Sequence, residues 1–427
     1  MAIQNTNNQE QAQSWTGLAF VWTGAMICIP SLMIGGTLIA GMPFWEAILT
    51  ALIGHGIIVV LMIFQGIQGS DLKMPAVKAA GQVFGKQGSK KLISIILAIS
   101  CLGWFGIQAN VCGMAFSQFL SLYQIDFPVW LSSIVWGIIM LVSALYGIKI
   151  LNLLNYIAVP VLLVVCLYAL VVSLKGGISP VFQHQPTTHL PFFSGLSITV
   201  GSFALGAVIA GDYSQYTKKR GDIVKASILG ILPSGIFMIL VGAVLAITAG
   251  TADITAVFTE LGLPVIGVVA LVLATWTTNA VNAFSGGIAI CNIFNFSKSK
   301  EKIAVACAGI LGTILAAFGI LNYFVPIMNV LSAMVPPVAG VMIASYWVIQ
   351  KGDKTKWQEV KGVNWMGVTA WSVGAVIACI PVIFSFFKEL PQFPNQPLIG
   401  CIISFVIYLV AKKVMDSRKK HVLEEDF

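Results

Sequence analysis

Long apolar runs, interrupted by short polar segments, extend along almost the whole chain. Twelve of them are long enough to cross a bilayer as a helix, which takes about 20 residues. They lie at about 17–42, 47–69, 92–122, 127–148, 152–174, 192–211, 224–250, 262–294, 302–322, 324–349, 365–386 and 394–413. Backbone groups in hydrocarbon must be paired internally, and these runs are too long for barrel strands. The pattern therefore predicts an all-α integral membrane protein with twelve transmembrane helices.

The composition excludes a soluble protein. Of the 427 residues, 58% are hydrophobic and 9% are charged, whereas a soluble domain carries about 25% charged residues. The formal net charge of +8 is compatible with nucleic-acid binding, but the basic residues lie in short clusters between the apolar runs. This placement fits membrane topology better than a surface that binds nucleic acid. We expect one transmembrane domain over residues 15–427.

The Lys and Arg residues predict the orientation of the chain. With the N-terminus inside, 22 of the 24 lie on cytoplasmic segments, and only Lys175 and Lys388 lie outside. Residues 1–14 are polar and contain no Lys or Arg, so they read as a cytoplasmic tail and not as a signal peptide. We expect a multi-pass protein of the cell inner (plasma) membrane with both termini in the cytoplasm. Residues 71–91 are expected to form a short amphipathic helix on that face, or a plain loop.

Gly and Pro residues inside two runs indicate broken helices. The first run contains Ile29-Pro30-Ser31 and Gly35-Gly36-Thr37, and the sixth contains Gly201-Ser202-Phe203, Gly206 and Gly211. Transporters commonly build their sites at discontinuous helices near the bilayer midplane. Helices one and six hold corresponding places in a five-plus-five repeat, so the paired weak points predict a site there. The alternative is that these residues serve only close helix packing.

Two further runs carry candidate site residues. In the third, Trp104 and Gln108 are four residues apart and share a helical face, so they offer a stacking surface and an amide to a flat, neutral heterocycle. The alternative is a packed Trp and a Gln bonded to a neighbouring helix. In the eighth, Ala274-Thr275-Trp276-Thr277-Thr278-Asn279 offers adjacent hydroxyls and a carbonyl, which suit a small hard cation. Here the alternative is that the threonines bond to their own helix.

No Walker, HExxH or GxSxG arrangement occurs in the sequence. We therefore expect neither an enzyme nor an ATP-driven pump, and no organic cofactor. An ion gradient is the expected energy source. Thr277 and Thr278 favour Na⁺ as the coupling ion, whereas His55 in the second run and Asp212 at the end of the sixth favour H⁺.

At these residues the chain resembles the nucleobase:cation symporters of the NCS1 type, which include cytosine permeases and hydantoin transporters. Five motifs carry the resemblance in order along the chain: Gly35-Gly36-Thr37-Leu38, Gly103-Trp104-Phe105-Gly106, Val200-Gly201-Ser202-Phe203, Trp276-Thr277-Thr278-Asn279 and Pro336-Pro337-Val338-Ala339-Gly340. The resemblance implies a five-plus-five inverted repeat with broken helices one and six. Repeat one would span about 17–174 and repeat two about 192–349, followed by two extra helices over about 365–413.

The resemblance also implies the roles of individual residues. Trp104 and Phe203 would stack on the two faces of the ring, while Gln108, Asn279, Asn282 and the backbone around Gly201 and Ser202 would read its edge. Cys101 takes the place of a Gln that reads the base in cytosine permeases. The implied sodium ligands are the carbonyls of Met26, Ile29 and Ala274 and the hydroxyls of Thr277 and Thr278.

The sequence also departs from the family pattern. Asn282 follows Asn279 by three positions where the hydantoin branch has four, Gln215 replaces an Arg, and Ser345 replaces an Asp. The expected function is cation-coupled import of a neutral nucleobase or related heterocycle, with cytosine or a similar pyrimidine or purine favoured. Open alternatives are a hydantoin, allantoin or hydroxymethylpyrimidine transporter and an amino-acid carrier of the same architecture. We expect a monomer in the lipid bilayer, with a small-molecule substrate and no nucleic-acid partner.

Overall fold

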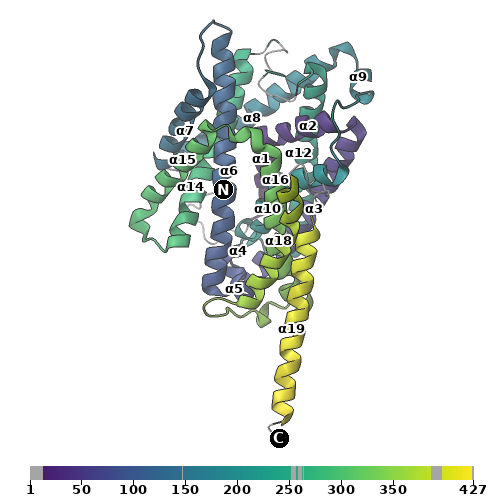
Figure 1. Cartoon of the computed structure of the whole chain (residues 1–427), viewed down its shortest axis with the longest axis vertical. Coiled ribbons are helices and arrows are strands. Elements are labelled where there is room, and N and C mark those ends of the chain that lie inside the picture. The colour runs from purple at the N-terminus through teal and green to yellow at the C-terminus, as the bar shows by residue number, and fades with distance from the viewer. Residues whose placement is uncertain are drawn as a thin grey trace.

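The chain folds into a bundle of long helices (Figure 1). A computed structural model describes residues 13–146, 148–251, 256–257, 262, 264–385 and 397–425, so most of the predicted tail, residues 1–12, lies outside the described residues. The main helices are α1 (Trp15–Met26), α2 (Ile29–Gly41), α3 (Phe44–Leu72), α6 (Lys86–Ser121), α7 (Val129–Tyr146), α8 (Ile148–Ser173), α10 (Phe192–Val208), α11 (Ala210–Ser214), α12 (Arg220–Ala249), α14 (Pro264–Phe294), α15 (Glu301–Ala317), α16 (Phe324–Met334), α17 (Pro336–Ile343), α18 (Trp365–Ser385) and α19 (Ile399–Glu425).

As far as the structure describes them, the predicted apolar runs each coincide with one helix or with two or three consecutive helical elements. Within the described residues, seven helices are long and apolar enough to cross a membrane, and the bent pair α1 and α2 makes an eighth. Helices over Val129–Leu145 and Phe192–Val208 are apolar but shorter. The all-helical, multi-span prediction is thus confirmed, while the count of twelve crossings stays a prediction.

The break in the first run has a local cause. Helices α1 and α2 are bent by 56° relative to one another at Ile27 and Cys28. In an unbroken helix the carbonyl of Met26 would accept the N–H of residue 30, but that residue is Pro30 and has no N–H to donate. The Met26 carbonyl instead accepts from the N–H of Cys28 at 2.9 Å. The carbonyl is therefore released from the helical ladder.

The sixth run is interrupted within the predicted stretch, between Gly206 and Gly211 and not at Gly201. Helix α10 passes through Gly201, Ser202 and Phe203 without a break, and the irregular residue is Ile209, between α10 and α11. Gly201 is a helix residue because a neighbouring helix requires its small size, as described below. Gly201 therefore marks a close contact between helices. The interruption lies between the other two glycines of this run, Gly206 and Gly211.

Helices from the first half of the chain pack against helices from the second half, in two groups. In one group α12 packs against α1 and α2, and α3 packs against α10 and α11; in the other, α6 packs against α15 and α7 against α14. Each pair joins one helix from the first half of the chain with one from the second, and α6 also packs against α14, α7 against α15 and α3 against α12. Gly35 and Gly242 allow a close crossing of α2 and α12, because a Cβ on either would collide with a carbonyl oxygen of the other helix.

The two-turn segment between α3 and α6 closes one end of the bundle, which we call the α4–α5 end. Residues 71–91 do not form one amphipathic helix: they include the end of α3, the short helices α4 (Ala76–Ala79) and α5 (Gly81–Phe84), and the start of α6. The segment after α17 holds them in place: the N–H of Asn364 donates to the Phe84 carbonyl at 2.7 Å, and the Trp357 indole donates to the Ala79 carbonyl at 3.0 Å. In Figure 1 the C-terminal part of α19 projects beyond this end, and α9 (Ser179–Phe182) lies at the opposite end.

Candidate functional site

Helix α16 brings the third and sixth predicted spans together. Its Phe324 meets the ring of Trp104 edge-on, with 6.3 Å between ring centroids. One turn later on the same face, the Met328 carbonyl lies so close to Gly201 of α10 that any Cβ at position 201 would collide with it. Two predicted site residues from helices that are far apart in sequence therefore contact adjacent turns of one helix. An edge-on contact leaves at least one face of the Trp104 indole available for stacking.

The remaining α10 residues of the predicted site lie next to α1. Phe203 is half-buried, and its ring meets the edge of Trp22 at 6.4 Å between centroids. The Trp22 ring in turn contacts the ring of Tyr213 of α11, with 4.7 Å between the ring centroids. The Ser202 hydroxyl donates to the Thr199 carbonyl at 2.6 Å, so in this structure it bonds to its own helix. An aromatic cluster thus links Phe203 to the last turns of α1 before the break.

Gln108 lies one turn beyond Trp104 on α6. The residue is buried, and its Oε1 atom has no hydrogen-bond partner within the described part of the chain. A buried carboxamide oxygen without a partner costs free energy unless a water or ligand satisfies it. Cys101, one turn before Trp104, is also buried, and its Cβ would lie 3.4 Å from a Cβ on Gly286 of α14. Gln108 is the better placed of the two to take a polar ligand.

Asn279 of α14 already has protein partners. Its amide donates to the Phe105 carbonyl of α6 at 3.0 Å and to Met140 Sδ at 3.1 Å, and its Oδ1 accepts from the Asn282 amide at 3.4 Å. In this structure Asn279 joins α14 to α6 at the residue next to Trp104. That Asn279 hydrogen-bonds to the edge of the substrate ring stays a prediction. It requires that the side chain gives up one of these protein partners when substrate binds.

The predicted cation ligands of α14 converge on one atom. The hydroxyls of Thr277 and Thr278 both donate to the Ala274 carbonyl, at 3.1 and 3.2 Å. Three neutral oxygens therefore cluster on one turn of helix, and each hydroxyl keeps lone pairs for a cation. Thr277 is buried and Thr278 is half-buried. Back-bonding of this kind was the alternative interpretation, and it leaves the cluster intact as a donor set for a small hard cation.

The other two predicted ligands flank the helix break. Met26 is the last residue of α1, and Ile29 is the first of α2. Helix α2 packs against α14, the helix that carries the hydroxyl cluster. The Met26 carbonyl and the threonine hydroxyls therefore lie on helices of neighbouring elements, and their joint role as cation ligands stays a prediction.

The two ionisable groups that favoured H⁺ lie in different surroundings. His55 is fully buried; its Nδ1 lies 2.8 Å from the Ala51 carbonyl, and its Nε2 has no partner among the described residues. The Asp212 carboxylate accepts from the N–H of Ala76 at 2.6 Å. Asp212 therefore holds α4 against α11, which is a structural contact at the α4–α5 end.

Sequence reasoning missed three buried polar groups near this region. Asn329 Oδ1 and Ser332 Oγ of α16 have no hydrogen-bond partner among the described residues, and neither does Trp22 Nε1. Asn329 follows Met328, the residue that packs on Gly201. A search of the tenth run for polar residues on one helical face would have found Asn329 and Ser332, which are three apart.

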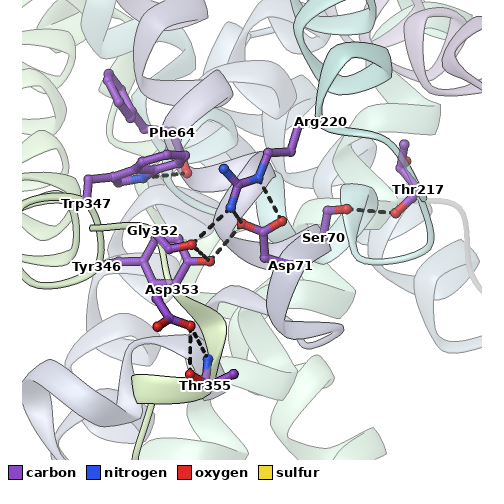
Figure 2. A network of polar contacts seen from close by, with 10 residues as sticks. All are labelled: Phe64, Ser70, Asp71, Thr217, Arg220, Tyr346, Trp347, Gly352, Asp353 and Thr355. Carbon is purple, nitrogen blue, oxygen red and sulfur yellow. Dashed lines mark hydrogen bonds and ion pairs between the residues drawn. The ribbon is translucent and has the colours of Figure 1, made fainter. Parts of the chain in front are cut away.

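A polar network ties three helices together at the α4–α5 end (Figure 2). We call Asp71, Arg220, Tyr346 and Gly352 the latch network. The Asp71 carboxylate, at the end of α3, accepts from Arg220 Nε and Nη2 at 3.0 and 2.6 Å and from the Tyr346 hydroxyl at 2.7 Å. Arg220 begins α12 and also donates to the Gly352 carbonyl at 3.0 Å. Tyr346 belongs to η4 (Ala344–Ile349), a π-helical turn that follows α17.

Neighbouring contacts reinforce the latch network. The Arg220 guanidinium lies over the Trp347 ring, 5.5 Å from its centroid, and the Trp347 indole donates to the Phe64 carbonyl at 3.3 Å. Beside them Ser70 Oγ and Lys73 Nζ donate to the Thr217 carbonyl at 2.7 and 2.8 Å. Burial lowers the pKa of the Lys73 amine from its ordinary value, partly offset by Asp71. At the α4–α5 end, the end of α3, the start of α12 and the η4 turn are therefore joined by these contacts.

Comparisons with known proteins agree with this architecture. The profile of a family described as "Permease for cytosine/purines, uracil, thiamine, allantoin" matches residues 6–399. The cytosine permease of Escherichia coli K12 is 29% identical over 360 residues, which is 84% of each chain. The hydantoin permease of Microbacterium maritypicum is 26% identical over 415 residues, covering 87% of this chain and 82% of the relative.

Solved structures show the same fold. The inward-facing structure of Mhp1 superimposes with a TM-score of 0.77 at 23% identity, covering 98% of this chain and 96% of that one. Mhp1 is described as a nucleobase-cation-symport-1 family transporter, and its closed, bromovinylhydantoin-bound structure superimposes with a TM-score of 0.73 at 22% identity, over 94% and 92% of the two chains.

Proposed function

The chain belongs to the family of permeases for cytosine/purines, uracil, thiamine and allantoin, the nucleobase-cation-symport-1 family, and from that premise we propose that it imports a neutral nucleobase or related heterocycle together with a cation. It is a membrane transporter and not an enzyme. Cytosine or a similar pyrimidine or purine is the proposed substrate, and Na⁺ is the proposed coupling ion. We propose that the α4–α5 end faces the cytoplasm and that the protein acts as a monomer in the inner membrane.

The arrangement on α16 is the observation that carries the substrate proposal. Trp104 and the Gly201–Phe203 segment meet α16 one turn apart, and the unpaired Oε1 of buried Gln108 lies one turn further along α6. A flat ring between Trp104 and Phe203 would stack on aromatic faces, and an N–H on its edge would satisfy Gln108. A leucine-like zwitterion would instead bring two charges into a site built from neutral groups.

The cation proposal rests on the oxygens of Ala274, Thr277 and Thr278 and on the carbonyl released at Pro30. A cation at this position would draw α2 and α14 together beside the ring site. The conformation that binds substrate would then also bind the cation, so each ligand would raise the affinity for the other. Alternating access follows if the α4–α5 end opens while the opposite end closes.

A panel of ligands tests the proposed function. We expect a single heterocycle to raise the melting temperature of the purified protein in the presence of Na⁺ and to have less effect with K⁺, because it binds only the folded, cation-loaded state. The panel comprises cytosine, uracil, adenine, hypoxanthine, allantoin, hydantoin, hydroxymethylpyrimidine and leucine. Stabilisation by leucine alone would favour the amino-acid carrier, and a shift from hydantoin or allantoin would favour those branches. Equal shifts with Na⁺ and K⁺ would contradict sodium coupling.

A substitution in the hydroxyl cluster tests the cation site. In Thr278→Ala we expect the Na⁺ concentration for half-maximal uptake to rise roughly tenfold or more, because one oxygen ligand, worth about 1.5 kcal/mol, is lost. Thr248→Ala is the control: like Thr278, Thr248 bonds to the carbonyl four residues before it, but it is exposed and lies on α12. An unchanged sodium curve in Thr278→Ala, or an equal change in the control, would contradict the site.

A further inference from the structure

A basic pocket lies at the α4–α5 end, away from the latch network. It has a volume of about 270 Å³ and is lined by Gln87, Lys90, Lys91 and Asn295. The first three residues come from the start of α6, and Asn295 follows the end of α14. Lys90 Nζ donates to Asn295 Oδ1 at 3.2 Å, so one ammonium group is positioned at the pocket. Asn295 itself has a left-handed backbone conformation with φ of 53°.

The positive charge of Lys90 and Lys91 is not balanced by an ion pair among the described residues. Within the described residues, the one ion pair near it joins Lys86 to Glu359 at 3.9 Å, and no carboxylate is paired with Lys90 or Lys91. The lysines also lie at the positive end of the α6 dipole, where the first turn contains no acidic residue. The N–H groups of Lys86 and Gln87 already donate to the carbonyls of Val360 and Gly362. A bound anion would therefore be held by side chains, and it would relieve this repulsion.

An apolar surface adjoins the pocket. Phe294 and Phe296, on either side of Asn295, are 63% and 43% exposed and stack with 5.6 Å between their ring centroids. Lys300 Nζ lies 5.2 Å from the centroid of Phe296. Exposed aromatic rings next to cations at the end of spanning helices match the boundary between acyl chains and headgroups. A soluble anion would contact only the lysines, whereas a lipid would contact the lysines through its headgroup and the two Phe rings through its acyl chains.

From this combination we propose that the pocket binds the headgroup of an anionic phospholipid. The phosphate would lie between Lys90 and Lys91, Asn295 and Gln87 would bond to headgroup oxygens, and the acyl chains would leave over Phe294 and Phe296. The lipid would bridge α6 and α14, which are the helices that carry Trp104 and the hydroxyl cluster. Bound lipid would thereby stabilise the packing of these two helices.

The test is lipid-dependent thermal stability of the purified full-length chain in detergent. We expect phosphatidylglycerol to raise the melting temperature more than phosphatidylcholine with the same acyl chains. Inorganic phosphate and glycerol phosphate should give no comparable increase, because they lack the apolar contact. Lys90→Gln combined with Lys91→Gln should lose most of the phosphatidylglycerol-specific increment, and the double Arg variant should keep it.

The matched control is Lys218→Gln combined with Lys219→Gln, which removes the same charge from exposed lysines of another segment. This control should keep the full increment. Equal stabilisation by the two lipids would overturn the proposal, as would an unchanged increment in the Lys90 and Lys91 double Gln variant. An increment reproduced by glycerol phosphate alone would assign the pocket to a soluble anion instead.

Discussion

Replacing Trp104 with Ala is expected to abolish most uptake, whereas Trp104→Phe should retain a substantial part of it. Stacking of one base on an aromatic side chain contributes about 1–3 kcal/mol, so losing the ring corresponds to a roughly 5- to 150-fold weaker apparent affinity. Phenylalanine keeps a flat face at the same position and can still meet Phe324 of α16. Initial uptake rates over a range of substrate concentrations, together with substrate-induced thermal stabilisation, measure the effect.

Folding defects must be separated from lost stacking. Trp104 packs partly against the core, so Trp104→Ala also leaves a cavity and should lower the melting temperature without ligand. The informative quantity is the further rise on adding substrate, which should be lost in Trp104→Ala and kept in Trp104→Phe. Trp365→Ala, at a 71% exposed tryptophan, serves as the control for expression and assay. Equal, near-normal uptake in both Trp104 variants would contradict the stacking role.

The fold was predictable wherever its cause lies within one segment. Run length and apolarity predicted the long helices, and Pro30 predicted the first break because the missing N–H acts on a carbonyl four residues earlier. Gly201 was misinterpreted as a weak point because its reason is the Met328 carbonyl, 127 positions further along the chain. No pattern within α10 distinguishes a glycine that breaks a helix from one that admits a neighbour.

The same distinction applies to the candidate site. Trp104 and Gln108 share a face by spacing alone, and the threonine cluster follows from adjacency on one helix. The partners of Asn279 could not be predicted, because Phe105 and Met140 come from two other helices. The latch network was missed for a similar reason: Arg220 and Tyr346 lie 149 and 275 positions after Asp71, and three polar residues so far apart form no sequence motif.

The second large effect is expected from the latch network, in Asp71→Asn. The Asp71 side chain is only 13% exposed and accepts three hydrogen bonds, two of them from the Arg220 guanidinium. Asparagine keeps the shape but loses the charge, and one of its two terminal atoms can only donate. Hydrogen bonds to charged groups contribute about 1.5–3 kcal/mol, a value to be reduced here because Arg220 is half-exposed.

The direction of the effect follows from which state contains the network. The latch network holds the ends of α3, α12 and η4 together at the α4–α5 end, so losing it favours conformations in which these elements separate and this end is more open. Losing about 1.4 kcal/mol would shift the balance between closed and open conformations roughly tenfold toward the open one. We therefore expect Asp71→Asn to lower uptake from outside about tenfold, chiefly through a weaker apparent affinity for external substrate. Tyr346→Phe, which removes one uncharged donor, should have a smaller effect.

Asp353→Asn is the matched control for this variant. Asp353 lies next to Gly352 and is also ion-paired, to Lys356 at 3.7 Å, but its side chain is 40% exposed and bonds within its own turn to Thr355. Because it joins no two helices, its substitution should leave uptake and affinity unchanged. In Asp71→Asn the melting temperature without substrate should fall only slightly, since the α4–α5 end keeps its backbone contacts. The loss of uptake would then not come from unfolding. Uptake that is normal in Asp71→Asn, or equally reduced in Asp353→Asn, would show that the network does not control closure.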